Sequence, residues 1–172
     1  IGSEAGPALA AILMGDTNPS GKLPFTFPVK LEDNSAHALG EFVYERSNEI
    51  VDVKYNEGIF VGYRWADKQK KVKPLFAFGH GLSYTTFEYG KVVADKKEMG
   101  MDEQLTVTVP ITNTGKREGA EVVQLYISDL KSSLPRPVKE LKGFQKVKLA
   151  PGETKEVTFI LSGLCCISAV AC

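Results

Sequence analysis

The chain has 172 residues, 43% of them hydrophobic and 24% charged, an ordinary composition for a globular protein of one or two small domains. Lysine plus arginine and aspartate plus glutamate both total 21, so the formal net charge is zero. No overall field would draw the chain to nucleic acid or to an anionic membrane, and no apolar run approaches the roughly 18 residues of a membrane span.

The first predicted element is a helix of two or three turns over residues 7–14, where the apolar side chains recur at helical spacing. Gly6 and Pro7 suit the N-cap and the first helical position, and Gly15 suits the C-terminal stop. Ser3 is a rival N-cap, but it would place Pro7 at a strained position inside the first turn.

A turn at Asn18–Gly21 follows, and Leu23, Phe25 and Phe27 then alternate as on a half-buried strand. Residues 29–54 lose periodicity, which predicts a long surface connection that lies across a neighbouring part of the protein.

Four stretches beyond Phe87 alternate with the period of strands, with turn residues between them. Pro110 indicates an edge position or a bulge in the first stretch. Phe144, out of phase beside Gly143, indicates a bulge in the third. The pattern predicts a mainly β, antiparallel sandwich. The side chains predicted to face inward are Leu105, Val107, Val109 and Ile111, then Val123, Leu125 and Ile127, then Leu141, Gln145, Val147 and Leu149, and finally Val157, Phe159 and Leu161.

All three cysteines, Cys165, Cys166 and Cys172, lie in the apolar tail LCCISAVAC. With no earlier cysteine to pair with, they do not predict a disulfide framework, and with both histidines far upstream they do not predict a zinc site. A frame-shifted end explains such a tail better.

Residues 55–87, YNEGIFVGYRWADKQKKVKPLFAFGHGLSYTTF, are dense in aromatic residues and glycines without sustained periodicity. This stretch resembles the bridge in family 3 glycoside hydrolases between their α/β sandwich domain and a fibronectin III-like domain. GDTNPSGKLPFTFP resembles the end of the first domain, and NTGKREGAEVVQLYISD, PRPVKELKGF and KLAPGETKEV resemble pieces of the second.

The resemblance implies four regions: the final helix and strand of the α/β sandwich domain (1–28), a linker and aromatic bridge (29–87), a truncated fibronectin III-like domain (88–163) and an atypical tail (164–172). From Leu164 onward the sequence departs from the family, where two further strands would follow. We therefore expect an incomplete sandwich in which the strand over 122–127 exposes unpaired backbone groups.

Retaining glycosidases need two carboxyl groups about 5 to 5.5 Å apart, and the resemblance implies an Asp nucleophile and a Glu acid/base, both upstream of Ile1. Glu4 and Asp16 are interpreted as helix-terminus or turn residues. Glu57 and Asp67 are expected to hold the bridge through hydrogen bonds or ion pairs, with Arg64 as a candidate partner. No catalytic residue is therefore predicted in this chain.

His80, between two glycines, is interpreted as part of a tight turn rather than as a general base, and His37 has no partner pattern. The aromatic residues Tyr44, Tyr55, Phe60, Tyr63, Phe76, Phe78, Tyr84 and Phe87 are expected to serve mainly in packing. Trp65 is the one candidate for a substrate subsite in the parent enzyme.

The resemblance implies a β-glucosidase, or a β-xylosidase of the same architecture, that removes terminal β-linked sugars from oligosaccharides, is secreted or periplasmic, and uses neither cofactor nor metal. The chain itself is expected to give structural support and to be inactive alone. The alternative is a non-catalytic immunoglobulin-like module that binds carbohydrate or plays a structural part.

Overall fold

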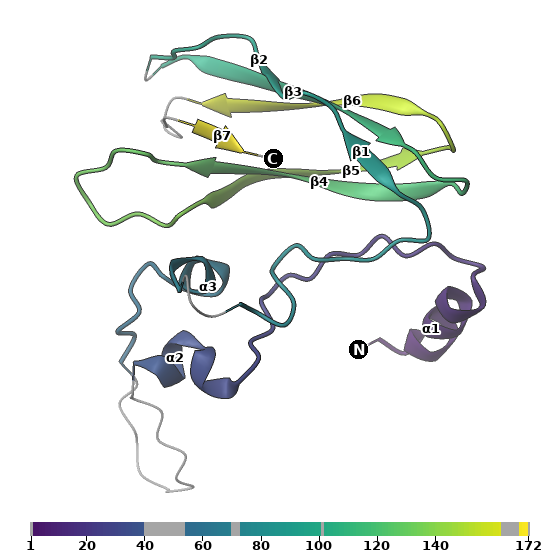
Figure 1. The fold of residues 1–172 in the computed structure, drawn as a ribbon, viewed down its shortest axis with the longest axis horizontal. Helices are drawn as coiled ribbons and strands as arrows, with labels where there is room; N and C mark the ends of the chain where they lie inside the picture. The colour runs from purple at the N-terminus through teal and green to yellow at the C-terminus, as the bar shows by residue number, and fades with distance from the viewer. Residues whose placement is uncertain (1, 40–53, 70–72, 101, 163–168, 172) are drawn as a thin grey trace, which may run out of the picture.

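The computed structural model describes residues 2–39, 54–69, 73–100, 102–162 and 169–171, which form a β-sandwich with an irregular, partly helical layer beneath it (Figure 1). The helices of that layer are short. They are α1 (Ala5–Met14), the 3₁₀ turn η1 (Leu31–Asp33), α2 (Ser35–Ala38) and α3 (Tyr63–Lys68). None of the helices in these ranges combines the length and the apolarity that crossing a bilayer requires.

Two antiparallel sheets form the sandwich, which confirms the predicted fold class. In the first sheet, β3 pairs with β1 and β2 along one side and with β6 along the other. In the second, β4 lies between β5 and β7. The strands are β1 (Phe87–Tyr89), β2 (Val93–Ala94), β3 (Gln104–Asn113), β4 (Gly119–Ser128), β5 (Glu140–Leu149), β6 (Thr154–Ser162) and β7 (Ala169–Ala171).

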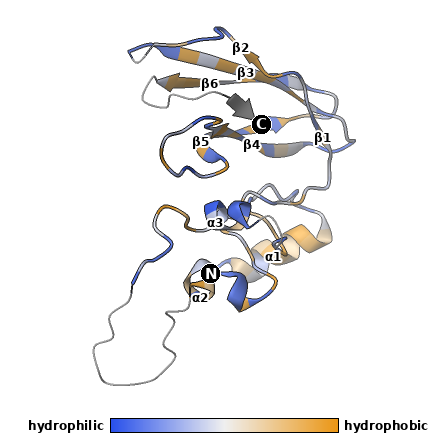
Figure 2. Cartoon of the chain, turned by 60° about the vertical axis from the view of Figure 1, so that its left-hand side comes forward, coloured by the Kyte–Doolittle hydropathy of each residue, from blue (hydrophilic) through white to orange (hydrophobic). Residues whose placement is uncertain are grey.

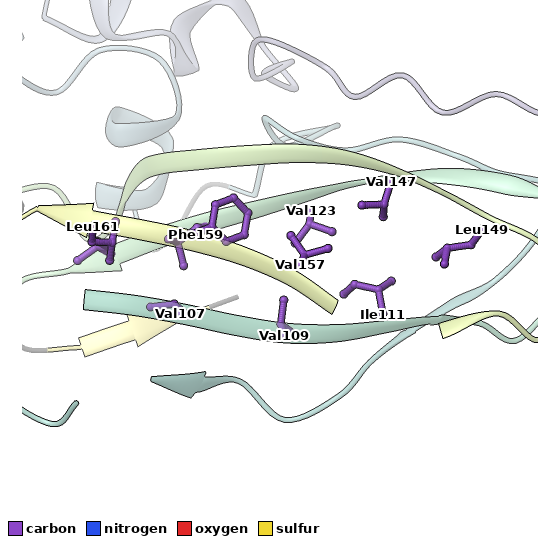
Figure 3. Close-up of a cluster of buried hydrophobic side chains, with 11 residues drawn as sticks. Val107, Val109, Ile111, Val123, Val147, Leu149, Val157, Phe159 and Leu161 are labelled. Atoms are coloured by element: carbon purple, nitrogen blue, oxygen red, sulfur yellow. The ribbon is translucent and has the colours of Figure 1, made fainter. Parts of the chain in front are cut away.

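The core of the sandwich is built from the alternating residues of β3, β4, β5 and β6 (Figure 3). Val109, Leu125 and Val157 are fully buried, so the predicted inward faces of three strands are confirmed. In β5 only Val147 and Leu149 are buried, and Gln145 is exposed. Full burial of such a side chain contributes roughly 1.5 to 3 kcal/mol, so the sandwich holds most of the stability of the chain.

The predicted bulge beside Gly143 is confirmed. The pairing of β4 with β5 shifts where Leu125 faces Gly143 and Tyr126 faces Leu141, so Lys142 is the additional residue. Phe144 lies opposite Gln124, alternates with the buried Val147 and Leu149, and is 71% exposed.

The predicted edge position of Pro110 is wrong, because β3 has neighbours on both sides. The Pro110 carbonyl accepts the Gly90 N–H at 2.8 Å, in the gap between β1 and β2. The nitrogen and the carbonyl of a strand residue point to the same side of the strand. The Pro110 nitrogen therefore faces the gap between β1 and β2, where no strand hydrogen bond is lost because of its missing N–H. A central strand therefore tolerates this proline.

The first helix starts earlier than predicted, at Ala5, with Glu4 as N-cap, so the Gly6 cap is wrong. Pro7 becomes the third helical residue, where no intrahelical N–H bond is required. Gly15 ends the helix in the left-handed conformation at φ 83°, as predicted.

Leu23–Phe27 forms no regular strand, and the chain bends at Pro24 and Phe25. Among the described residues, its backbone hydrogen bonds join Phe27 to Leu75 and Phe76, and join Leu23 to the turn at Gly79 and His80. The predicted connection over 29–54 contains η1 and α2, and its residues 40–53, with Tyr44, lie outside the described residues.

β7 comes from the tail, and it pairs only with Tyr126–Ser128 of β4. Cys165, Cys166 and Cys172 lie outside the described residues. Within the described residues, the expectation of an unpaired side holds for 122–125 but not for Tyr126 and Ile127, which β7 pairs.

Candidate functional site: the anchor between the leading segment and the sandwich

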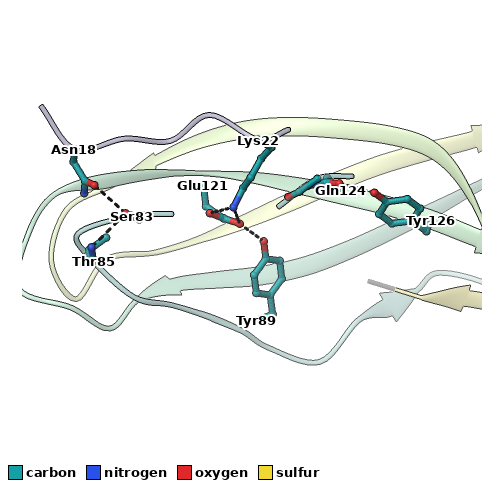
Figure 4. A network of polar contacts seen from close by, with 9 residues as sticks. Asn18, Lys22, Ser83, Thr85, Tyr89, Glu121, Gln124 and Tyr126 are labelled. Atoms are coloured by element: carbon teal, nitrogen blue, oxygen red, sulfur yellow. Dashed lines mark hydrogen bonds and ion pairs between the residues drawn. The ribbon is translucent and has the colours of Figure 1, made fainter. Parts of the chain in front are cut away.

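The leading segment (residues 2–28) and the bridge (residues 55–87) are fastened to the sandwich by polar contacts, which we call the anchor (Figure 4). Asn18 lies at its centre. The Asn18 Oδ1 accepts hydrogen bonds from Ser83 Oγ at 3.0 Å and from the Tyr84 N–H at 2.8 Å. Its Nδ2 donates to the Glu118 carbonyl at 2.9 Å. One side chain thus joins three segments that are distant in the sequence.

A second contact places an ion pair at β4. The Nζ of Lys22 lies 2.9 Å from Oε1 and 3.0 Å from Oε2 of Glu121. The hydroxyl of Tyr89 donates to the same Oε1 at 2.9 Å. Because Tyr89 belongs to β1 and Glu121 to β4, this carboxylate ties the two sheets to each other and to the leading segment (Figure 4).

The end of α1 is held by two side chains. The Arg117 guanidinium donates to the Gly15 carbonyl at 2.6 Å, and the Tyr84 hydroxyl donates to the Ile12 carbonyl at 2.8 Å. The last carbonyls of a helix lack intrahelical donors, and a cation there also interacts favourably with the helix dipole. These bonds fix the helix to the β3–β4 turn through Arg117 and to the bridge through Tyr84.

Aromatic rings join the bridge to the outer face of β4. Tyr63 of α3 stacks on Phe78 with centroids 4.8 Å apart and meets Tyr126 edge-on at 6.1 Å. The Tyr126 hydroxyl donates to Gln124 Oε1 at 2.6 Å, and Gln124 Nε2 donates to the Gly79 carbonyl at 3.2 Å. Burial, followed by the nearby Tyr63 and Asp67, raises the pKa of Tyr126 to about 12.

The charged residues of α3 pair with the start of β5 rather than within the bridge. Arg64 lies 3.3 Å from Glu140, and Asp67 lies 3.8 Å from Lys139. The expectation that Arg64 pairs with Glu57 or Asp67 is therefore wrong, because β5 brings an acidic side chain to the guanidinium. Both ion pairs add to the anchor instead of closing a local loop.

Asn113, at the end of β3, is completely buried, and its side-chain amide makes four hydrogen bonds. Its Oδ1 accepts from Thr85 Oγ1 at 2.7 Å and from the Gly115 N–H at 3.1 Å. Its Nδ2 donates to the carbonyls of Arg117 at 2.8 Å and Leu149 at 3.1 Å. The full capacity of the amide is used, which connects the bridge to both sheets.

The four carboxylates considered from the sequence lie in three separate places. Glu4 and Asp16 flank α1, Glu57 lies in the turn before α3, and Asp67 lies on α3. No hydrogen bond or ion pair in the described residues joins two of them. The described residues also contain no group of three or more His, Cys, Asp or Glu side chains that could hold a metal ion.

His80 lies in the predicted tight turn, with Gly79 in the left-handed conformation at φ 79°. Its carbonyl accepts the Leu23 N–H at 2.8 Å, and its ring lies 5.3 Å from that of Phe76. His37 is on α2, in its last turn.

Trp65 is 9% exposed, and its indole N–H donates to the Asp33 carbonyl at 3.1 Å. It borders a hollow of about 60 Å³ together with Thr26, Asn34 and Gly62. Ligand pockets are typically about 300 to 1,000 Å³. The assignment of Trp65 to a substrate subsite stays a prediction.

The residues of the anchor were not identified from the sequence. Lys22, Glu121 and Gln124 lie in segments that carry the family resemblance, but the sequence does not indicate their partners, which are set by the way the leading segment crosses β4. The available signal was the presence of the polar residues Glu121 and Gln124 in the otherwise largely apolar β4.

Fold and anchor together define a fibronectin III-like sandwich that carries a segment of a neighbouring domain. The comparison with protein families agrees: residues 1–63 match the glycosyl hydrolase family 3 C-terminal domain, and residues 121–163 match the fibronectin type III-like domain. The chain therefore belongs to the C-terminal region of glycoside hydrolase family 3.

Curated relatives are β-glucosidases. A β-glucosidase of Bacteroides ovatus is 53% identical over 161 residues, which cover 94% of this chain and 21% of the relative. A thermostable β-glucosidase B of Acetivibrio thermocellus is 52% identical over 160 residues, which cover 93% of this chain and 20% of the relative. The chain thus spans about a fifth of the length of these relatives.

Solved structures give the same result. β-Glucosidase 3B from Thermotoga neapolitana, in complex with glucose, matches with a TM-score of 0.81 and 42% identity, over 93% of this chain and 21% of that one. A family 3 β-glucosidase of Bifidobacterium adolescentis matches with a TM-score of 0.80 and 39% identity, over 93% of this chain and 22% of that one.

Proposed function

We propose that this chain is the bracing region of a retaining β-glucosidase that removes terminal β-linked glucose from oligosaccharides. The names of the relatives support the glucosidase activity, and terminal xylose is the second substrate that the family resemblance allows. In this account the chain holds the end of the α/β domain on the sandwich, while hydrolysis takes place in other domains. The match of residues 1–63 to a glycosyl hydrolase domain favours this over a free-standing immunoglobulin-like module.

The observation that carries the proposal is the contrast between the two faces of the leading segment and bridge. One face is fastened to the sandwich by the anchor. Elsewhere this layer exposes large apolar side chains, as the orange colour of α1 in Figure 2 illustrates. A surface this apolar indicates contact with another protein surface, here the rest of the α/β domain. The exposed residues outside the anchor are Leu9, Leu13, Met14, Phe25, Phe27, Tyr55, Ile59, Val61, Leu75, Phe76 and Leu82.

The reaction requires a nucleophilic carboxylate and a second carboxyl group that acts as acid and then as base. We assign both to other domains, because the carboxylates of the described residues are engaged in ion pairs and turns or lie apart. The oligosaccharide would then meet this chain only at its border with those domains, where Trp65 remains the candidate contact. Secretion or export to the periplasm is the corresponding expectation for the whole protein.

The experiment is an assay of the purified 172-residue chain with 4-nitrophenyl β-glucoside and 4-nitrophenyl β-xyloside. We expect release of nitrophenol no faster than in buffer. Turnover that disappears on Glu57→Gln or Asp67→Asn substitution would contradict the assignment of the catalytic groups to other domains.

A further inference from the structure

Three cations surround one carboxylate at the start of β5. The Glu140 carboxylate lies 3.3 Å from Arg64 of α3, 3.9 Å from Arg136 of the β4–β5 loop and 3.5 Å from Lys142. Among the ion pairs between described residues, no second carboxylate joins this cluster. The cluster therefore carries an excess of positive charge, although the formal net charge of the chain is zero. The Arg64 and Arg136 side chains are 36% and 53% exposed, so an incoming anion can reach both.

The outward face of β5 continues from this cluster. Phe144 and Lys146 lie opposite Gln124 and Val122 of β4, and residues directly opposite each other share one face of a sheet. Phe144 is 71% exposed, and Lys146 is exposed beside it. Two residues along a strand span about 7 Å, so the ring and the ammonium group stand next to each other. An open aromatic ring thus lies between the cationic cluster and a further lysine.

We propose that this surface, which we call the β5 patch (Arg64, Arg136, Lys142, Phe144 and Lys146), binds an oligosaccharide of uronic acids. A pyranose ring presents a flat face of C–H groups, which suits contact with an exposed aromatic ring. With one sugar on Phe144, the carboxylates of the neighbouring sugars lie on either side of that ring, toward the cluster at one end and toward Lys146 at the other. Guanidinium groups suit this role because they bind a carboxylate through two parallel hydrogen bonds.

The composition of the β5 patch favours this ligand over other occupants. The leading segment and the bridge expose many apolar side chains, which suit the surface of another domain, whereas the β5 patch combines four cations with a single ring. An acidic peptide would pair with the cations but would not require the ring. The choice of a sugar rests on the proposed glycosidase function, and the β5 patch would then favour oligosaccharides that carry acidic groups.

The test is an NMR titration of the ¹⁵N-labelled chain with a pentamer of galacturonic acid. The comparison ligand is the fully methyl-esterified pentamer, which keeps the rings and loses the charges. We expect the acid to shift the amides of residues 140–146 saturably, and the ester to bind at least about fivefold more weakly. Phe144→Ala and Arg136→Gln should each weaken binding of the acid. Ile160→Ala and Lys91→Gln, which remove an exposed apolar side chain and an exposed lysine elsewhere, are the matched controls and should leave the affinity unchanged.

The same titration with penta-glutamate separates a sugar from an acidic peptide. Penta-glutamate that binds as tightly as the sugar acid would overturn the proposal, because charge alone would then suffice. Equal affinity of acid and ester, an affinity that Phe144→Ala does not lower, or the absence of saturable shifts within 140–146 would overturn it as well. Binding is measured without hydrolysis, so a failure here is distinguishable from a failure of the proposed glucosidase function.

Discussion

The ammonium group of Lys22 lies 2.9 Å from the carboxylate of Glu121, a residue 99 positions further along the chain. Both side chains are largely shielded, at 20% and 12% exposure. This pair, with the Tyr89 hydroxyl on the same carboxylate, makes the leading segment part of the sandwich rather than a free extension. The anchor turns two regions of the sequence into one structural unit.

A double-mutant cycle with Lys22→Met and Glu121→Gln should therefore give a coupling energy of about 1 kcal/mol in urea unfolding. The control is the pair Lys96–Glu103, at 3.2 Å but 38% and 54% exposed. Exposed pairs are worth roughly 0 to 1 kcal/mol, so the control should lie near zero. Equal coupling energies for the two pairs would refute a special contribution of the anchor.

Asn113→Ala should lower the free energy of unfolding by about 3 kcal/mol, because buried hydrogen-bonding groups lose their partners. Asn113→Asp has the same shape, but it loses both donors and introduces a charge at a fully buried site, so it should be at least as destabilising. Asn34→Ala, which removes a cap from α2, should cost only about 1 kcal/mol. Guanidinium unfolding measures all three, and a small loss for Asn113→Asp would contradict the role of its donors.

Tyr126 should be among the last tyrosines to ionise, since burial raises its pKa to about 12. A pKa that is raised in the folded state contributes stability that is complete below the unfolded pKa of about 10 and is lost as pH rises toward 12. An absorbance titration at 295 nm should show the highest-pH step disappear in Tyr126→Phe. If the highest-pH step remains in Tyr126→Phe, it belongs to another tyrosine, and burial does not raise the pKa of Tyr126 as the structure indicates.

Gly90→Ala should destabilise the sandwich by roughly 1 to 3 kcal/mol through overpacking. A Cβ at Gly90 would lie 2.5 Å from the Pro110 Cγ. Thermal unfolding of Gly90→Ala with and without Pro110→Ala tests this contact, and the second substitution should restore part of the loss. Gly2→Ala, where a Cβ meets no atom within 4 Å, is the control.

Strand faces were predictable because alternation fixes which side chains share a face, as for Val107 and Val109 or Val157 and Phe159. The bulge at Gly143 was predictable because Phe144 breaks that alternation. Alternation does not specify partners, so Leu23–Phe27 was predicted as a strand although its described pairing is one isolated bridge. The six-residue α3 was missed because it is too short to show helical periodicity.

The anchor could not be predicted for a related reason. Lys22 with Glu121 and Arg64 with Glu140 are non-local pairs, determined by how the chain crosses the sheet. The family resemblance identified the family that the comparisons confirm, but it carried no information on the partners of these side chains.

The most direct test is the activity of a chimera in which this chain replaces the 161-residue matching region of the Bacteroides ovatus β-glucosidase. We predict hydrolysis of 4-nitrophenyl β-glucoside with a KM close to that of the parent enzyme, and faster loss of activity on heating when Lys22 and Asn113 are both replaced by alanine. A folded chimera without glucosidase activity would contradict the account. So would a chimera that loses activity on heating at the same rate with and without the two substitutions.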